Sequence, residues 1–130
     1  MDVPCPLCSA AEGRELLSAN THAVGIWDAF PVSPGHALIV SRRHVGDLFE
    51  LRAEEQAALW ALLPAVKIAI GARHAPAGYN VGVNVGTAAG QTIGHVHVHV
   101  IPRYEGDVRD PRGGIRWVLP ERAAYWGRSR

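Results

Sequence analysis

The chain has 130 residues, of which 48% are hydrophobic and 19% charged, and its formal net charge is +1. This length suits one globular domain with a single core, and the balanced charge does not favour binding to nucleic acid or to a membrane surface. The longest uncharged apolar run, residues 56–66, is too short to span a bilayer, and the first residues lack a basic-then-apolar signal segment, so we expect a cytoplasmic protein.

The only two cysteines lie near the N-terminus, in Cys5-Pro6-Leu7-Cys8. This spacing favours metal ligation or redox exchange over a structural disulfide. A redox pair usually sits at a strand-to-helix turn, whereas this proline-flanked segment is expected to be irregular. A tetrahedral zinc site would need two more ligands, and the chain has seven histidines. The cysteines therefore predict a zinc site, with two unliganded thiols as the alternative.

Residues 24–30 predict a strand, a proline-punctuated turn follows at 31–36, and the apolar residues 37–40 predict a second strand. Asp28 lies where the first strand ends, a position at which aspartate often only shapes an Asx turn. His36 ends the turn, and its ordinary role would be that of a packed, hydrogen-bonded core histidine.

Residues 53–73 predict a helix, because apolar residues recur at three- and four-residue steps from Leu59 to Ile70. Pro64 inside this stretch predicts a kink or a broken turn. A shorter helix is expected near residues 45–51. These helices carry no chemical groups that suggest catalysis, so we expect them to cover the core.

Residues 79–85 return to alternation and predict a strand whose polar face carries Gly82 and Asn84. Asn84 would then share a face with functional groups on a neighbouring strand. The alternative is that its amide caps a turn at the strand end.

Three histidines, His95, His97 and His99, then alternate with three valines. This pattern predicts a half-buried strand with all three imidazoles on one face, successive rings being about 6.5 to 7 Å apart. Histidine can act near neutral pH as a base, a nucleophile or a metal ligand. The row therefore indicates chemistry, although a polar sheet face that happens to contain histidines is the alternative.

The connection before this strand, residues 87–94, is rich in glycine and small residues. Such a connection allows backbone N–H groups to approach an anion closely, and Gln91 and Thr92 offer side-chain donors. A phosphate-sized ligand could therefore bind beside the histidines.

Beyond residue 103 the chain is rich in glycine, proline and arginine and ends in an aromatic and basic stretch. The arginines could meet the outer phosphates of a substrate or belong to a solvated tail. Trp117, Tyr125 and Trp126 predict that this tail docks on its own domain or on a second subunit.

Three pieces of sequence resemble the signature of the histidine triad family, and the likeness extends over about residues 5–104. These pieces are Asn84-x-Gly86, Gly90-Gln91-Thr92 and His95-x-His97-x-His99-Val100-Ile101. The family consists of nucleotide hydrolases and transferases that act at the α-phosphate, and the chain is most similar to the bacterial zinc-containing type that resembles diadenosine polyphosphate hydrolases. The resemblance implies an α+β fold, with an antiparallel sheet of about five strands, one long helix and one short helix. It also implies a domain at 1–104, which includes the zinc-binding segment, and a tail at 105–130.

The resemblance implies a role for each matching residue. His97 would be the nucleophile that forms a transient nucleotidyl-phosphohistidine, and His99 would donate to the phosphate or to the leaving group. The other implied residues are Gly90, Gln91 and Thr92 at the phosphate, Asp28 and Asn84 at the ribose, and Cys5, Cys8, His44 and His95 as ligands of a structural zinc.

The expected activity is thus cleavage at the α-phosphate of dinucleoside polyphosphates, adenosine phosphoramidates or nucleotidyl sugars, in a homodimer and with magnesium as a possible companion of a polyphosphate. The segment Gly113-Gly114-Ile115-Arg116 resembles a tail found in the hydrolase branch of the family, which slightly favours dinucleoside polyphosphates. Two alternatives are a metal-dependent hydrolase with the triad as ligands and a nucleotide-binding regulatory module whose hydrolysis is vestigial.

Overall fold

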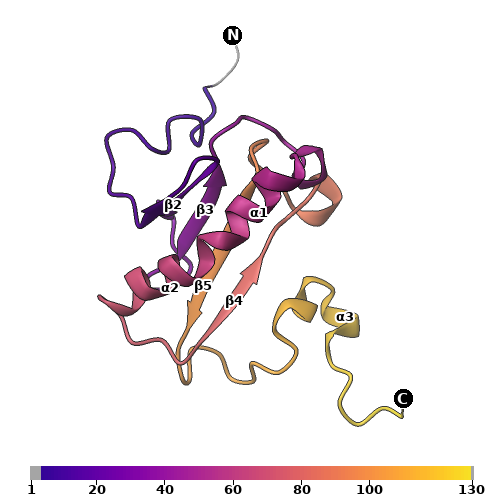
Figure 1. Cartoon of the computed structure of the whole chain (residues 1–130). Coiled ribbons are helices and arrows are strands. Elements are labelled where there is room, and N and C mark those ends of the chain that lie inside the picture. The colour runs from indigo at the N-terminus through magenta and orange to yellow at the C-terminus, as the bar shows by residue number, and fades with distance from the viewer. Residues whose placement is uncertain (1–3, 130) are drawn as a thin grey trace.

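The computed structural model describes residues 4–129, whose centre is a five-stranded antiparallel sheet (Figure 1). Its order is β1-β2-β3-β5-β4, so the histidine strand lies between two neighbours. The strands are β1 (Ser18–Ala19), β2 (Ala23–Trp27), β3 (Ala37–Ser41), β4 (Gly78–Gly82) and β5 (His97–Arg103). The α+β fold with five antiparallel strands, predicted from the sequence, is confirmed.

Two helices, α1 (Ala53–Ala61) and α2 (Leu63–Gly71), lie across one face of the sheet (Figure 1). They form the predicted long helix as two segments that meet at Leu62. Pro64 lies in the first turn of α2, where its missing N–H would have had no helical partner. The short predicted helix is a single 3-10 turn, η1 (Leu48–Glu50).

The register of β5 separates its valines from its histidines. Val98 lies opposite Ile39 of β3, and both are fully buried beneath the helices. His97 and His99 point to the other face because side chains alternate along a strand. On β4, Gly82 is the residue opposite His99. The strand ends there, so Asn84 lies just beyond it and not within the predicted strand at 79–85.

The histidine face is covered in part by the N-terminal segment. Leu7 and Ala10 are buried against side chains of β2 and β3, among them Ile26 and Leu38. This small second core holds the irregular N-terminal segment close to the sheet. It thereby keeps the two cysteines of the segment near His44 and His95.

The C-terminal segment contributes a 3-10 helix, η3 (Gly114–Val118), and a short helix, α3 (Pro120–Ala123). The two pack against each other, and η3 contacts β4 (Figure 1). The division of the chain at residue 104 stays a prediction. Among the described residues, no helix is both long enough and apolar enough to cross a membrane.

Candidate functional site

His97 is held in the form that a nucleophilic imidazole needs. Its Nδ1 lies 2.7 Å from the backbone carbonyl oxygen of His95. A carbonyl can only accept, so Nδ1 carries the proton and Nε2 keeps its lone pair. The side chain is 9% exposed. The backbone of the histidine strand therefore fixes the tautomer of the middle histidine.

A second chain of hydrogen bonds fixes the proton of His99. The backbone N–H of Val32 donates to Nδ1 of His36 over 3.1 Å, so the neutral His36 ring carries its proton on Nε2. This Nε2 lies 3.0 Å from Nδ1 of His99. Because His36 donates there, His99 carries its own proton on Nε2, which is free to donate to a ligand.

Burial keeps both of these rings neutral. It lowers the pKa of His36, and the nearby Asp28 carboxylate offsets part of that shift. Burial also lowers the pKa of His99, and the neighbouring His97 and His36 lower it further. The two rings therefore act at neutral pH as a fixed pair of donors and not as cations.

Asp28 forms the Asx turn that was one of its two expected roles, while its contact with a ribose stays a prediction. Its Oδ1 accepts the backbone N–H of Phe30 at 2.8 Å, which is an Asx turn. Its Oδ2 lies 3.4 Å from Nε2 of His36. The carboxylate thus lies beside the histidine pair, with one oxygen engaged in the turn.

In the glycine-rich connection, the side chain of Gln91 is bonded to the backbone of the loop and of its neighbour. The Gln91 amide accepts from the backbone N–H of Gly86 at 2.8 Å and donates to the carbonyls of Gly46 and Ile93 at 2.7 and 3.0 Å. These hydrogen bonds hold the loop in its conformation. The Gln91 amide would have to break them before it could donate to a phosphate. Thr92 lines a cavity of about 380 Å³ next to this loop. Gly90 has a φ of +95°, a conformation that favours glycine.

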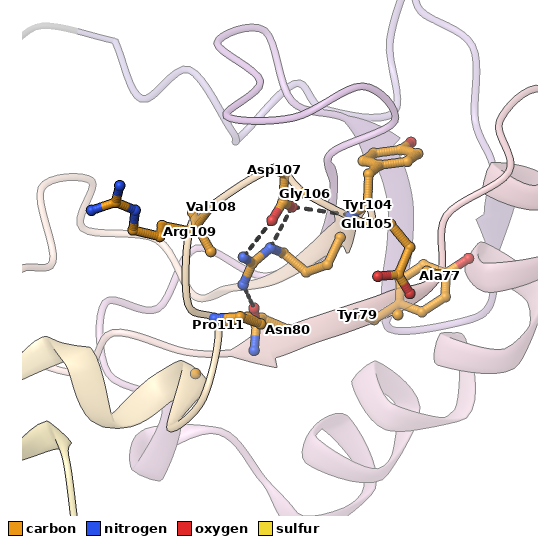
Figure 2. A pocket seen from close by; sticks show the side chains of 13 residues that line it. Ala77, Tyr79, Asn80, Tyr104, Glu105, Gly106, Asp107, Val108, Arg109 and Pro111 are labelled. Atoms are coloured by element: carbon orange, nitrogen blue, oxygen red, sulfur yellow. Dashed lines mark hydrogen bonds and ion pairs between the residues drawn. The ribbon is translucent and has the colours of Figure 1, made fainter.

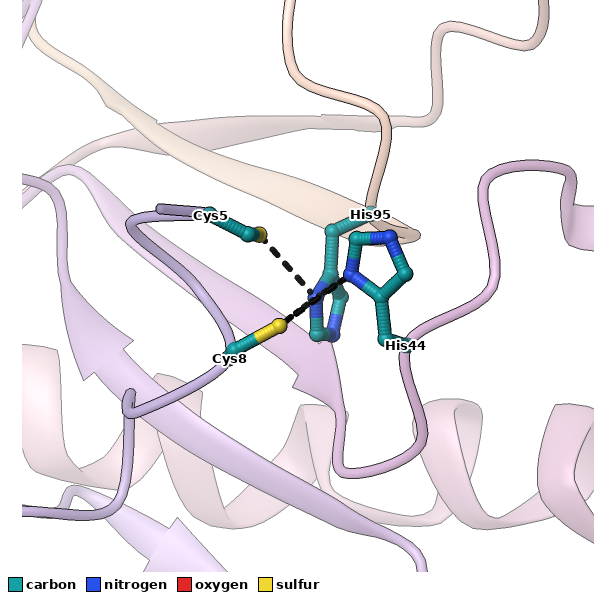
Figure 3. Close-up of side chains that lie close together, drawn as sticks. All are labelled: Cys5, Cys8, His44 and His95. Carbon is teal, nitrogen blue, oxygen red and sulfur yellow. Dashed lines mark hydrogen bonds between the residues drawn. The ribbon is translucent and has the colours of Figure 1, made fainter. Parts of the chain in front are cut away.

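The four predicted metal ligands converge at one point (Figure 3). The Sγ of Cys5 lies 3.4 Å from Nδ1 of His95, and the Sγ of Cys8 lies 3.1 Å from Nδ1 of His44. The two Nδ1 atoms are 3.3 Å apart. Tetrahedral Zn²⁺ with ordinary bond lengths requires about 3.6 Å between sulfur and nitrogen and about 3.3 Å between two nitrogens. The donor set therefore fits a zinc ion.

The backbone also prepares His95 for this role. Its Nε2 donates to the carbonyl of Ser41 over 2.6 Å, which leaves the Nδ1 lone pair directed at the thiols. The three histidines of the row consequently do not converge on one point, because His95 faces the cysteines while His99 faces His36.

A cavity of about 670 Å³ lies beside His36 and His99, and Asn84 also lines it. Ile115 and Val118 of η3 and the following Leu119 contribute to its lining. Sequence reasoning singled out the segment that contains Ile115 but gave none of these three residues a place at the site. Their place depends on how the tail folds back on β4.

A further cavity, of about 430 Å³, lies at the far end of β5 (Figure 2). Arg103 there forms a double hydrogen bond with Asp107, with both distances 2.8 Å, and donates to Asn80 at 2.7 Å. Arg103 holds the pKa of the Asp107 carboxyl well below its usual range. The positive charge of Arg103 is therefore already compensated by the carboxylate of Asp107.

Comparisons with known proteins, by sequence and by structure, find related proteins. A family model described as the HIT domain matches residues 13–106. A HIT-like protein of Mycoplasma pneumoniae is 36% identical over 104 residues, which cover 78% of this chain and 72% of that protein. The AP-4-A phosphorylase of Mycobacterium tuberculosis is 40% identical over 103 residues, covering 78% of this chain and 52% of the enzyme. The crystal structure of a Zn-bound histidine triad family protein from Mycobacterium smegmatis superposes with a TM-score of 0.68 at 33% identity, covering 82% of this chain and 83% of that one.

Proposed function

The chain belongs to the HIT domain family, and from that premise we propose that it is a nucleotide hydrolase or nucleotidyltransferase that reacts at the α-phosphate through a covalent intermediate on His97. The observation that carries the proposal is the 2.7 Å hydrogen bond from Nδ1 of His97 to the His95 carbonyl, which leaves Nε2 unprotonated. The similarity to an AP-4-A phosphorylase supports a nucleotide substrate.

In the first step, Nε2 of His97 attacks the α-phosphorus, and an N–P bond forms as the bond to the leaving group breaks. His99 supplies its Nε2 proton to the leaving group. In the second step, water attacks the same phosphorus, the N–P bond breaks, and the nucleoside monophosphate departs. The one proton that the attacking water loses returns to Nε2 of His99, and His97 leaves the phosphorus as the neutral imidazole.

The remaining predicted residues would bind the other parts of the nucleotide. Asp28 and Asn84 would contact the ribose. Thr92 and the backbone at Gly90 would hold phosphate oxygens, where they would stabilise negative charge in the transition state. For Gln91 we propose that its main contribution is to hold this loop closed, since its amide already has three backbone partners.

We propose a structural zinc at Cys5, Cys8, His44 and His95, supported by the fit of the donor distances and by the Zn-bound relative. When bound, the ion would supply a rigid link between the N-terminal segment and the start of β5. The homodimer, the cytoplasmic location and a role for magnesium stay predictions.

The decisive experiment compares wild type with His97→Ala in turnover of diadenosine tetraphosphate and of adenosine 5′-phosphoramidate. We expect His97→Ala to lower kcat at least about a thousandfold, because the nucleophile is lost. In wild type, a reaction stopped in alkali, where phosphohistidine survives, should yield protein with the mass of one added nucleotidyl group.

His22→Ala is the matched control, since the His22 imidazole lies outside the row and the site described above. It should keep wild-type turnover. Turnover that survives His97→Ala would contradict the nucleophile assignment. Tight nucleotide binding without turnover in wild type would favour the regulatory module.

A further inference from the structure

We propose that Cys5 and Cys8 form a site of reversible oxidation, at which a peroxide converts the two thiolates to a disulfide and the chain thereby gives up its zinc ion. This inference rests on the structural zinc proposed above, and it adds a regulatory chemistry that the proposed reaction at His97 does not use. The chain has only these two cysteines, so a disulfide within one chain can join no other pair.

The turn that carries the cysteines brings their side chains close enough to bond. The backbone N–H of Cys8 donates to the carbonyl of Cys5 over 3.3 Å, which closes a four-residue turn. The Cα atoms at the two ends of such a turn lie within about 7 Å of each other, and a disulfide requires about 4.4 to 6.8 Å. The two Sγ atoms already lie within 4.8 Å of each other, and both side chains point toward the histidines (Figure 3). A disulfide therefore needs only a local movement of this turn.

The two thiols differ in exposure, which gives them different roles in the oxidation. Cys8 is exposed, whereas Cys5 is half-buried and packs against the small second core. Cysteines that bind zinc are thiolates, and the thiolate is the form that a peroxide oxidises. A peroxide from solvent reaches the Cys8 sulfur first. Cys8 is thus the sulfur that is oxidised, and Cys5 is the sulfur that resolves the product.

The oxidation takes two steps. In the first, the Cys8 sulfur attacks one oxygen of hydrogen peroxide, an S–O bond forms, the O–O bond breaks and hydroxide leaves, so that Cys8 becomes a sulfenic acid. In the second, the Cys5 sulfur attacks the Cys8 sulfur, an S–S bond forms, the S–O bond breaks and a second hydroxide leaves. The two sulfurs lose two electrons, the peroxide gains them, and protons from solvent convert both hydroxides to water.

The disulfide removes two of the four zinc ligands at once. A cysteine binds metal as the thiolate, and neither sulfur of a disulfide is one. The remaining ligands, His44 and His95, supply two nitrogens, whereas structural zinc sites are four-coordinate. The chain therefore loses the ion as the disulfide forms, and it binds zinc again only when both thiolates return.

The histidine half of the site keeps its shape without the ion, because hydrogen bonds within the domain hold it. Nε2 of His95 donates to the carbonyl of Ser41 over 2.6 Å. Next to His44, Arg43 donates two hydrogen bonds, of 2.8 and 3.0 Å, to the Glu55 carboxylate, which is 2% exposed. The cysteine half instead joins the sheet through the small second core. Reduction of the disulfide therefore finds both histidines in place, and zinc rebinds without refolding of the domain.

The test treats zinc-loaded wild type with hydrogen peroxide in the presence of a chromogenic zinc chelator, with a parallel sample that receives no peroxide. We expect peroxide to release about one zinc per chain, to lower the mass of the chain by that of two hydrogen atoms, and to remove both alkylatable thiols. Excess dithiothreitol followed by Zn²⁺ should restore the original zinc content. The Tm of the oxidised protein should equal that of chelated wild type.

Cys5→Ser separates the two steps, because Cys8 stays exposed but loses its partner. In this variant we expect peroxide to leave a sulfenic acid on Cys8, which dimedone traps, and to form no disulfide within the chain. Ser9→Ala is the matched control, since it changes an exposed neighbour and keeps both thiols. It should release zinc at the wild-type rate.

Zinc that stays bound at a peroxide concentration that oxidises a free dithiol peptide would overturn the inference and leave the structural zinc intact. Zinc release that yields sulfinic acid without a disulfide would overturn it in the same way. A wild-type protein that binds no zinc would refute the structural zinc and, with it, the release of the ion. None of these three results bears on His97, whose role is decided by turnover.

Discussion

At the scale of single residues, His36 is placed to orient His99 on the proposed catalytic face. It is 2% exposed and receives a hydrogen bond from its own turn while it donates to His99. Its position follows from the turn at residues 31–36, which returns the chain onto β3. We therefore regard His36 as a positioning residue that sets the tautomer of His99.

Replacing His36 should separate this role from simple packing. His36→Phe keeps a ring of similar size but donates nothing, so we expect kcat to fall by about 10- to 100-fold, as for other residues that orient a functional histidine. His36→Gln provides both an acceptor for Val32 and a donor for His99 and should recover part of that loss. The measurement is kcat together with thermal stability.

The pH profile adds a readout that packing would not move. Because burial lowers the pKa of both His36 and His99, both rings stay neutral at pH 7, and activity should decline only below the usual histidine value of about 6.5. If His36→Phe and His36→Gln lose activity equally, with unchanged pH profiles, the residue acts only through packing.

At the scale of elements, the close contact between β2 and α2 depends on Gly25. A Cβ at this position would lie 2.7 Å from Cγ2 of Val66, which is buried in the core. This distance is too short for two carbon atoms, so a side chain would force the helix away from the sheet.

We therefore expect Gly25→Ala to lower the free energy of unfolding by about 1 to 3 kcal/mol through overpacking. Gly78→Ala is the matched control, because Gly78 also lies in a strand and a Cβ there would have no neighbour within 4 Å. Denaturant unfolding of both variants checks the prediction. Equal stabilities would show that α2 moves without cost.

The elements also show how far sequence reasoning reaches. Strict alternation from His95 to Val100 predicted one histidine face and one core face, since the period of a strand is two, and the structure confirms this separation within β5. The partners of Gln91 were not predictable, because one is the carbonyl of Gly46, which is far away in the chain. The place of the η3 residues that line the cavity was not predictable for the same reason, because it depends on the contact of η3 with β4.

At the scale of the whole molecule, the proposed zinc site joins the N-terminal segment, which lies outside the sheet, to the rest of the domain. From residue 4, where the described part of the chain begins, no strand or helix precedes β1. This segment carries two thiols and contacts the sheet through buried Leu7 and Ala10. His44 lies in the loop that follows β3, and His95 lies just before β5. Such a segment gains little stability from its own backbone, so a metal link would contribute much of its order.

Removal of the metal should therefore loosen one end of the molecule and leave the chemistry in place. We expect about one zinc per chain in wild type. Chelation or Cys8→Ser should lower Tm by about 10 °C and make residues 4–16 sensitive to protease, because the thiolate ligands no longer hold the segment. Turnover should persist below that Tm, since no step of the proposed reaction uses the ion.

Ser9→Ala, at an exposed neighbouring position, is the control and should behave as wild type. Loss of turnover at a temperature where the chelated protein remains folded would instead assign the metal to catalysis, and a protein without zinc that matches wild type in Tm would remove the ion from the structure altogether.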